Sequence, residues 1–466
     1  MVFSSLTFLY LLLPLAVVPY FLIPNRHWRN FLLLAVSLLF YSWGEPKYLA
    51  LLLAATAVTY AGTLAIAACP KGRGARRAVL VVTIVLLVAD LMYFKYLGFF
   101  WENLGRILPL EGALPSIALP LGISFYTFQL LSYLIDVYRG QVDCQRNFFY
   151  LLLYVSFFPQ LVVGPIVRYG TVADVLRERE TSWDEVAAGL KRFILGLAKK
   201  VLIANQTAAV ADLIYNGSPD IYGTSMYWLA AFAYTMQIYF DFSGYSDMAL
   251  GLGRMFGFRF DENFDHPYVS LSATEFWRRW HISLSTWFRD YIYIPLGGNR
   301  VDRARWVRNI LIVWILTGFW HGAQWNFILW GLYYAAFLLL EKFFLAKLLA
   351  RLPVVVRWLY AFFVVDLGWV LFHLTDFDQL AHALHTMFVW QGTSLAQVLA
   401  TDASILHGLV WLPLALVCSF PLLDRLPKRR GAAWALAADA VYGVLFLVCL
   451  AFILSSSYDP FIYFRF

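Results

Sequence analysis

The chain has 466 residues, of which 61% are hydrophobic, 18% are aromatic and 14% are charged. An average soluble domain has about 25% charged residues, so this composition excludes a soluble globular protein and indicates an integral membrane protein. The net charge of +7 does not indicate nucleic-acid binding, because lysines and arginines gather in short segments between apolar runs, where the positive-inside rule places them. We therefore expect membrane lipid, and no nucleic acid, among the partners.

Apolar runs recur along the whole chain. A helix needs about 20 apolar residues to cross the hydrocarbon core of a bilayer, which is ~30 Å thick. Backbone polar groups in lipid must be satisfied within their own segment, so each span is expected to be a helix. The sequence predicts an all-α polytopic membrane protein with about 10–12 transmembrane helices in one domain over residues 1–466. The predicted spans cover residues 6–24, 30–43, 48–68, 78–100, 117–137, 148–167, 226–256, 309–340, 354–374, 404–423 and 432–455.

The orientation of the chain is predicted from the charges that flank the spans. The first run follows MVFSS, with no positive charge before it and no small-residue cleavage site behind it, so we interpret it as a retained span rather than a secretory signal. The basic segments 25–30 and 69–77 are separated by two spans and should both be cytoplasmic. This orientation places the N-terminus outside the cytoplasm, and the basic segment 424–430 before the last run places the C-terminus outside as well.

Residues 170–215 are helical in propensity but too charged to span a membrane. We predict amphipathic helices that lie at the membrane interface. Their basic residues Lys191, Arg192, Lys199 and Lys200 are expected near anionic lipid headgroups on the cytoplasmic side.

One apolar run is interrupted by the carboxylates of Asp241 and Asp247. Carboxylates buried at membrane depth must be paired or protonated. The predicted partners are Arg278, Arg279 and Arg289. We favour a scaffold role for the aspartates over a catalytic one.

The segment EFWRRWHISLSTWFRDYIYIPLGGNR, residues 275–300, is dense in arginine and tryptophan. Set on one helix over residues 275–291, its aromatic side chains and His281 fall on one face and its charged side chains on the other. Ser272 and Glu275 have the spacing of a capping box, which predicts the start of that helix. The polar face excludes a lipid-exposed span, so we predict an in-plane or re-entrant helix.

His321 lies within the apolar run 309–341, roughly 18 Å along a helix from its start, which is close to the bilayer midplane. Ionisable groups at this depth are costly and are usually functional. Gly318 and Gly322 flank this histidine, and we predict a break or kink there. The alternative is a neutral imidazole bonded to a neighbouring carbonyl. For His281 such a structural role is favoured over catalysis, and the two histidines are candidates for one shared cavity.

The four cysteines show no metal-ligand spacing such as CxxC, and two of them lie within apolar runs. We therefore predict no metal site and no redox site. No tandem repeat and no long linker divides the chain, which supports a single domain. The cysteines are Cys69, Cys144, Cys418 and Cys449.

Five segments give the sequence a pattern, in this order: PLGISFYTFQ, FDFSGYSDMALGLG, EFWRRWHISLSTWFRDYIYIPLGGNR, GFWHG and the terminal FIYFRF. With these motifs the chain resembles the membrane-bound O-acyltransferases over its whole length. The resemblance implies a helical fold with a central tunnel, in which an acyl group, expected to be acetyl, passes from a cytoplasmic thioester to an acceptor on the other face. It implies acetyl-CoA or an acyl carrier protein as the donor substrate, and no permanently bound cofactor. The catalytic histidine of the family matches His321, and its second polar position matches His281.

Histidine suits this chemistry, because an oxygen nucleophile is weak until its proton is removed and imidazole takes and returns a proton near neutral pH. His321 is therefore the predicted general base. Four tryptophans are candidates for lining an acyl passage, with ordinary aromatic packing as the favoured interpretation of each. They are Trp280, Trp287, Trp320 and Trp325.

The terminal segment DPFIYFRF adds one more candidate. Related systems resemble this chain in carrying a C-terminal aromatic motif whose tyrosine is proposed to hold the acyl group in transit, and Tyr463 is its counterpart here. A phenol, with a pKa of ~10, forms a more reactive ester than an alkyl alcohol does. The alternative is an aromatic anchor at the membrane surface.

The resemblance favours the branch of the family that modifies bacterial envelope polymers. It implies O-acetylation of an extracytoplasmic polysaccharide such as alginate, at the bacterial inner membrane, with cellulose, peptidoglycan or teichoic acid as alternative acceptors. An extracytoplasmic acetyltransferase and the exopolysaccharide synthesis machinery are the implied partners. Two other functions stay open: an acyltransferase that acts on a protein or lipid, and a transporter of polysaccharide or small molecules. The absence of an internal repeat and the few embedded charges speak against a transporter.

Overall fold

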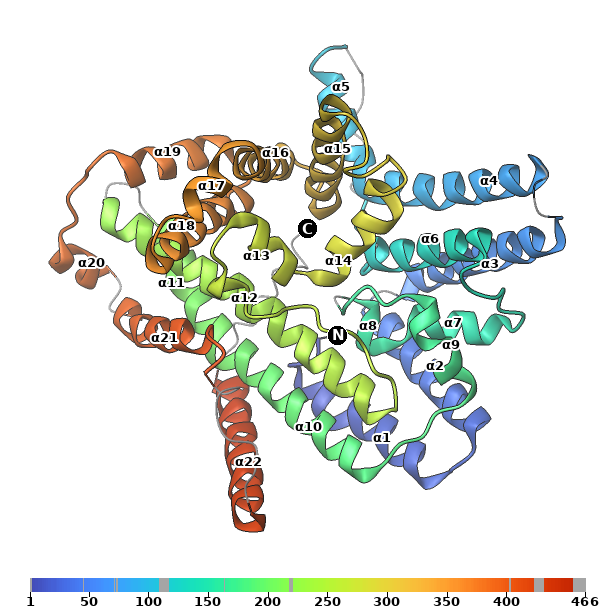
Figure 1. Ribbon diagram of the computed structural model, residues 1–466. Coiled ribbons are helices and arrows are strands. Elements are labelled where there is room, and N and C mark those ends of the chain that lie inside the picture. Colours follow the sequence, from blue (N-terminus) through green and yellow to red (C-terminus); the bar gives the residue numbers. More distant parts are fainter. Residues whose placement is uncertain are drawn as a thin grey trace. The chain divides into compact units, whose positions relative to one another are not determined.

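The computed structural model describes residues 2–44, 46–70, 72, 74–108, 117–162, 164–217, 221–401, 404–422 and 431–455. In this part of the chain the regular structure is helical, without strands (Figure 1). The predicted all-α fold is therefore confirmed. The chain forms two compact units, the first from Met1–Phe193 and Ser246–Asp261 and the second from Ile194–Tyr245 and Glu262–Phe466.

The first unit is built from the N-terminal helices. The side chain of Asn25 accepts hydrogen bonds from the backbone N–H groups of His27 and Trp28, and the side chain of Asn147 accepts one from Phe149. These caps satisfy N–H groups that have no partner within their own helix. The helices are α1 (Leu13–Leu22), α2 (Arg26–Ser42), α3 (Pro46–Ala68), α4 (Gly74–Leu91), α5 (Leu97–Gly105), α6 (Ile123–Arg139), α7 (Phe148–Ser156), α8 (Phe158–Leu161), α9 (Tyr169–Arg177) and most of α10 (Trp183–Ala198), with π-helical turns at Phe8–Leu12 and Met92–Tyr96.

The second unit holds the end of α10, all of α11 (Asn205–Tyr215), most of α12 (Thr224–Met255) and all later helices. Acidic side chains cap two of them: Asp302 accepts from the N–H of Arg305, and Asp376 accepts from the N–H of Gln379. The remaining helices are α11 (Asn205–Tyr215), α12 (Thr224–Met255), α13 (Ala273–Arg279), α14 (Ile282–Phe288), α15 (Arg303–His321), α16 (Trp325–Leu340), α17 (Ala346–Leu349), α18 (Val354–His373), α19 (Phe377–Phe388), α20 (Leu395–Thr401), α21 (Ser404–Cys418) and α22 (Ala432–Ser455), with π-helical turns at Lys199–Ala204, Arg289–Tyr293 and Glu341–Leu345.

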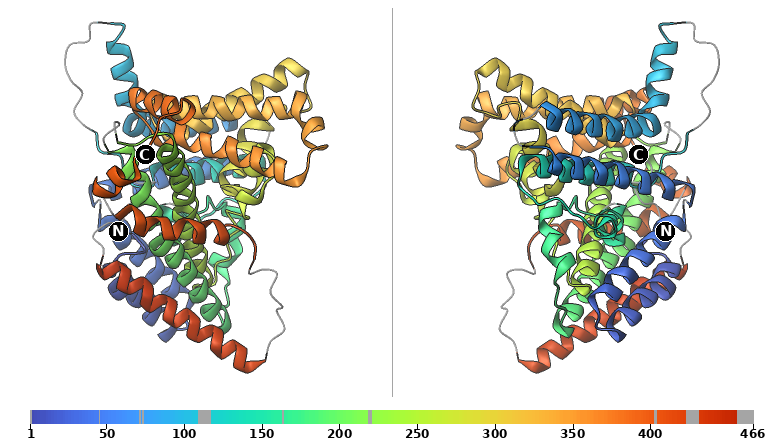
Figure 2. Two further views of the ribbon diagram at one scale, coloured as in Figure 1. Left: turned by 90° about the vertical axis from the view of Figure 1, so that its left-hand side faces the viewer. Right: turned by 90° about the vertical axis from the view of Figure 1, so that its right-hand side faces the viewer.

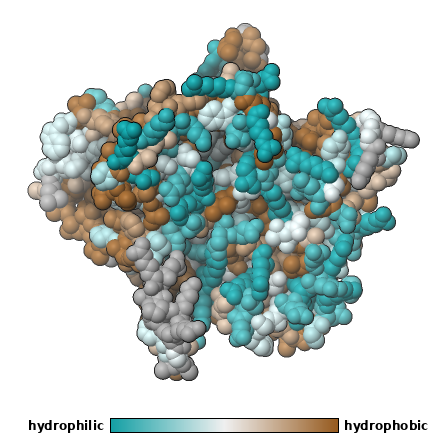
Figure 3. Space-filling view, viewed as in Figure 1, coloured by the Kyte–Doolittle hydropathy of each residue, from teal (hydrophilic) through white to brown (hydrophobic). Residues whose placement is uncertain are grey.

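Among the described residues, five helical segments are long and apolar enough to cross a membrane. Apolar side chains also reach the protein surface, where Figure 3 shows them in brown. In α22, the lowest red helix in both views of Figure 2, only 6% of the span is covered by protein, so most of its surface is available to lipid. The chain is thus a multi-pass membrane protein. The five segments are Pro46–Ala68, Gly74–Gly105, Trp325–Leu349, Val354–His373 and Trp434–Ser455, and two shorter apolar helices are Phe8–Leu22 and Gly408–Cys418.

The break predicted at His321 is confirmed. Helix α15 ends at His321, Gly322 is extended with φ −171° and ψ 157°, and α16 begins at Trp325. The apolar run is therefore two helices that meet beside the histidine.

The single helix predicted over residues 275–291 is wrong. Helix α13 ends at Arg279, and α14 begins only after His281. His281 has φ 44° and ψ 55°, which is the left-handed region of backbone space. A left-handed residue turns the chain. The side chains before and after His281 therefore do not form one continuous helical face.

The single span predicted over residues 148–167 is also wrong. Helix α7 ends at Ser156, and α8 begins at Phe158. Pro159 has no N–H to donate to the carbonyl of Val155, so one continuous helix would lose a hydrogen bond and clash there.

The partners predicted for the aspartates of α12 are wrong. In the second unit, Asp241 Oδ1 lies 2.8 Å from Lys200 Nζ, and these side chains are only 2% and 3% exposed. In the first unit, Asp247 Oδ1 lies 2.9 Å from Arg192 Nη2. Lys200 thus neutralises a buried carboxylate, because a charge in the interior needs a partner. The prediction that Lys200 lies near lipid headgroups is therefore wrong.

Two of the predicted arginine partners bind carboxylates close to them in sequence instead. Arg279 Nε lies 3.1 Å from Glu275 Oε1, and its Nη1 lies 2.8 Å from Asp265 Oδ2. Arg289 Nε lies 2.7 Å from Asp290 Oδ1. A pair that closes a short loop loses less chain entropy than a distant pair, which favours these local partners.

Candidate functional site

His321, the last residue of α15, is buried among aromatic rings of the second unit. Its ring centroid lies 4.9 Å from that of Trp320, 5.1 Å from that of Trp330 and 5.2 Å from that of Phe372. The planes cross at 82–83°, which is the edge-to-face geometry that aromatic pairs favour. Helices α15, α16 and α18 therefore enclose the imidazole and fix its orientation.

Glycines allow α15 and α16 to meet closely at the break. A Cβ atom at Gly318 would overlap the carbonyl oxygen of Phe327, and one at Gly331 would overlap that of Trp314. A Cβ atom at Gly322 would overlap the ring of Phe327. Small residues at such contacts are typical of helix pairs in membranes. The glycines on both sides of the histidine are thus required by packing.

Asn326, in the first turn of α16, holds the end of α18. Its Nδ2 donates to the carbonyl oxygens of Leu371, at 3.3 Å, and Phe372, at 3.1 Å. The last carbonyl groups of a helix have no partner within that helix, so this side chain satisfies them. The bond fixes the backbone of Phe372 and with it the ring that packs on His321.

His281 is buried in the same unit. Its ring lies perpendicular to that of Phe242, with centroids 4.7 Å apart, and its centroid lies 5.9 Å from that of Trp320. Because Trp320 also contacts His321, the structure brings both predicted histidines to one tryptophan. Burial lowers the pKa of His281 to about 3, so its imidazole is neutral at neutral pH.

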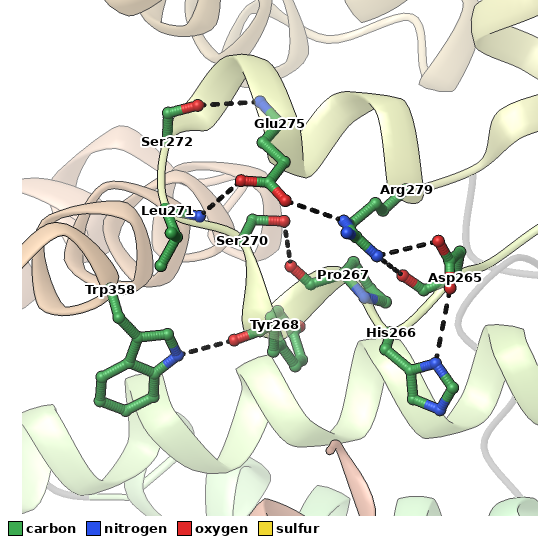
Figure 4. Close-up of polar contacts among 10 residues, drawn as sticks. All are labelled: Asp265, His266, Pro267, Tyr268, Ser270, Leu271, Ser272, Glu275, Arg279 and Trp358. Atoms are coloured by element: carbon green, nitrogen blue, oxygen red, sulfur yellow. Dashed lines mark hydrogen bonds and ion pairs between the residues drawn. The ribbon is translucent and has the colours of Figure 1, made fainter. Parts of the chain in front are cut away.

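The turn that leads into α13 is tied by hydrogen bonds (Figure 4). Ser272 Oγ accepts from the N–H of Glu275 at 3.0 Å, as the predicted capping box requires. The carboxylate of Glu275 accepts from the N–H of Leu271 at 3.0 Å, one residue earlier than predicted. Arg279 then joins Glu275 to Asp265. These bonds fix the start of the segment on which the second histidine lies.

Glu341 anchors the N-terminus of α13 from the end of α16. Its side chain, only 4% exposed, accepts from the N–H groups of Ala273, at 2.7 Å, and Thr274, at 2.9 Å. The hydroxyls of Thr274, at 2.5 Å, and Tyr360, at 3.2 Å, also donate to it. A carboxylate at a helix N-terminus satisfies N–H groups and complements the helix dipole.

The tryptophans predicted as candidates for an acyl passage differ in environment. Trp280, Trp287 and Trp320 are buried, whereas Trp325 is 49% exposed. Trp280 packs against Trp369, with centroids 4.7 Å apart. Aromatic packing accounts for Trp280, and the tunnel implied by the family resemblance stays a prediction.

Tyr463 lies outside the described residues, and its role stays a prediction. Sequence reasoning missed Glu341 and also Asn263, whose Oδ1 lies 3.2 Å from His281 Nδ1. Asn263 stands in a polar loop where an amide is ordinary, and Glu341 follows a long apolar run, where a carboxylate is expected to face water. Neither residue belongs to a spacing pattern, so no signal in the sequence indicated its place at the site.

Comparison with known proteins identifies relatives of the whole chain. A model of the membrane-bound O-acyltransferase family, MBOAT, matches residues 144–364. The chain is 43% identical over 402 residues to the probable alginate O-acetylase AlgI of Azotobacter vinelandii, which covers 85% of this chain and 80% of that protein. It is 39% identical over 454 residues to the probable alginate O-acetylase AlgI of Pseudomonas aeruginosa, which covers 94% of this chain and 86% of that protein. Identity to the peptidoglycan O-acetyltransferase of Helicobacter pylori is 32%, over 100% of this chain and 98% of that protein.

Proposed function

Because the chain belongs to the membrane-bound O-acyltransferase family and is therefore an O-acyltransferase, we propose that it moves an acetyl group from a cytoplasmic thioester to an extracytoplasmic polysaccharide, with His321 as the general base. The observation that carries this proposal is the position of His321. It ends α15 inside an aromatic enclosure and shares Trp320 with His281.

The proposed reaction requires a hydroxyl, a thioester and a base. His321 takes the proton of the attacking hydroxyl while the oxygen bonds to the thioester carbonyl carbon. The carbon–sulfur bond then breaks, and the thiolate takes the proton back from the imidazolium, so the products are an ester, a free thiol and an unchanged histidine. Imidazole suits both proton transfers near neutral pH. The aromatic enclosure limits the access of water, so hydrolysis of the thioester is slow relative to transfer.

Alginate is the acceptor that we propose. The similarity to two probable alginate O-acetylases supports it, and the similarity to a peptidoglycan O-acetyltransferase supports peptidoglycan as an alternative. Cellulose and teichoic acid are further alternatives. The donor is acetyl-CoA or an acetylated acyl carrier protein, used as a substrate rather than held as a cofactor.

The proposed setting is the bacterial inner membrane, with both termini outside the cytoplasm and residues 1–466 acting as one acyltransferase domain. The basic segments between the apolar runs support this orientation. An extracytoplasmic acetyltransferase receives the acetyl group, and the exopolysaccharide synthesis machinery supplies the polymer.

The central test is His321→Ala. We expect acetyl transfer from radiolabelled acetyl-CoA to fall by about 10²–10⁴-fold, because a general base contributes this much, while the protein stays folded and inserted in the membrane. His385→Ala, at an exposed position of α19, is the matched control. Wild-type acetylation of the polymer by a normally expressed His321→Ala protein would remove the proposal.

Tyr463 is proposed to carry the acetyl group in transit, as a phenyl ester that keeps much of the reactivity of the thioester. The Tyr463→Phe variant keeps the ring and removes only the nucleophile. We expect it to lose polymer acetylation, and we expect mass spectrometry of the wild-type protein to find an acetyl-tyrosine when the extracytoplasmic acetyltransferase is absent. Full acetylation by Tyr463→Phe would mean that this residue is an aromatic anchor.

A further inference from the structure

Asn263 lies against the imidazole of His281, although it belongs to no motif. Its side chain is 1% exposed, and both residues belong to the second unit. Asn263 Oδ1 lies 3.2 Å from His281 Nδ1, 3.1 Å from the backbone N of Ser283 and 2.9 Å from Ser283 Oγ. The backbone N–H of Ile282 donates to the carbonyl of Asn263 at 3.0 Å. Asn263 is thus bonded to the left-handed residue and to the two residues that follow it.

These bonds determine which nitrogen of the imidazole carries the hydrogen. A backbone N–H can only donate, so the atom of Asn263 that faces Ser283 N must be the carboxamide oxygen. His281 Nδ1 faces the same oxygen, which can only accept. The Ser283 hydroxyl, 3.4 Å from Nδ1, donates its one hydrogen to Asn263 Oδ1, so Nδ1 must itself bear a hydrogen. Because the buried imidazole is neutral, Nε2 carries a lone pair.

The Nε2 atom of His281 is a hydrogen-bond acceptor that is not satisfied within the described part of the chain. It is buried, and no described residue gives it a hydrogen bond. The rings beside the imidazole belong to Phe242 and Trp320. A buried acceptor without a partner is costly, and Trp320, which contacts His281, also contacts His321, so the geometry indicates that a bound molecule satisfies Nε2.

We propose that Asn263 is a positioning residue that holds His281 as the Nδ1–H tautomer, so that Nε2 accepts a hydrogen bond from a polar hydrogen of the bound substrate. The inference rests on the proposed function and deepens it. The polar hydrogen belongs to an amide N–H of the pantetheine arm of the donor or to the attacking hydroxyl of the acceptor. Both groups offer the same chemistry to Nε2.

The tautomer is tested on the wild-type protein by ¹⁵N NMR of labelled histidines in lipid nanodiscs. His281→Asn identifies the signal by its loss, and asparagine is chosen because it tolerates the left-handed backbone. We expect a neutral ring with the hydrogen on Nδ1. A hydrogen on Nε2, or a doubly protonated ring, overturns the proposal.

The positioning role is tested by kinetics in two backgrounds. Asn263→Leu removes the oxygen at similar size and is expected to lower acetyl transfer at least tenfold, whereas Asn263→Asp keeps the oxygen and restores most of it. In the His281→Asn background, Asn263→Leu should cause no further loss. An equal loss in both backgrounds overturns the proposal, because Asn263 would then only support the fold. Asn309→Leu, which removes a buried amide that bonds Leu296 and Gly298, is the matched control.

The two sources of the polar hydrogen are separated with acetyl-CoA as the probe. If the donor supplies it, Asn263→Leu raises the KM for acetyl-CoA in hydrolysis without an acceptor. If the acceptor hydroxyl supplies it, hydrolysis is unchanged and only transfer to the acceptor falls. Unchanged hydrolysis with unchanged transfer overturns the proposal. Failure of the proposed function is distinct from these results, because it appears as activity in His321→Ala.

Discussion

Replacement of Glu341 by glutamine is expected to loosen the N-terminus of α13. The two carboxylate oxygens each accept from one backbone N–H, that of Ala273 or that of Thr274. A glutamine keeps one oxygen and places an NH₂ group where the other stood, and this group faces an N–H that can only donate. One buried N–H then loses its partner, which costs about 1–3 kcal/mol.

Thermal unfolding of the purified protein measures this loss. For the second unit, which has about 260 residues, 1–3 kcal/mol corresponds to a fall in melting temperature of about 2–6 °C. Acetyl transfer should fall as well, because α13 leads into the turn at His281. Asp302→Asn is the matched control, since an asparagine caps the exposed start of α15 as well as an aspartate does. A Glu341→Gln protein that melts and reacts like the wild type would refute the reasoning.

Two further predictions concern packing and pH. Gly318→Ala is expected to lower acetyl transfer at least tenfold, because its Cβ would overlap the carbonyl of Phe327 and overpacking costs about 1–3 kcal/mol. Gly98→Ala, where nothing lies within 4 Å of the new atom, is the control. Equal activity of the two variants would contradict the prediction. The hydrogen bond from Arg254 lowers the pKa of the Glu185 carboxyl, so this pair stabilises the fold above the unfolded pKa of ~4.3 and the stabilisation is lost as the pH falls through the folded pKa. The melting temperature of the wild type should therefore fall more steeply below pH ~4 than that of Glu185→Gln. Glu178→Gln, at an exposed position, is the control. Parallel curves of melting temperature against pH for the wild type and Glu185→Gln would show that the pair contributes nothing.

The sequence predicted those features that depend on local information. Hydropathy is a local property, so the apolar helices were predictable, and the glycines beside His321 indicated the break because a helix is weak there. The turn at His281 was not predictable, because histidine is not a usual breaker and bonds from Asn263 hold the backbone. The partner of Asp241 was not predictable either, since several cations were available and only the folded chain selects Lys200.

The left-handed backbone at residue 281 also limits the mutations that a gene can accept there. Histidine codons change to asparagine or aspartate codons by one base, and these residues tolerate a positive φ. Leucine, tyrosine and arginine codons are also one base away, but these residues meet a steric penalty at a positive φ. The backbone conformation therefore limits which substitutions the fold accepts at residue 281, whatever their effect on catalysis. A saturation library at residue 281 should rank asparagine above alanine in protein yield, although alanine is the smaller residue.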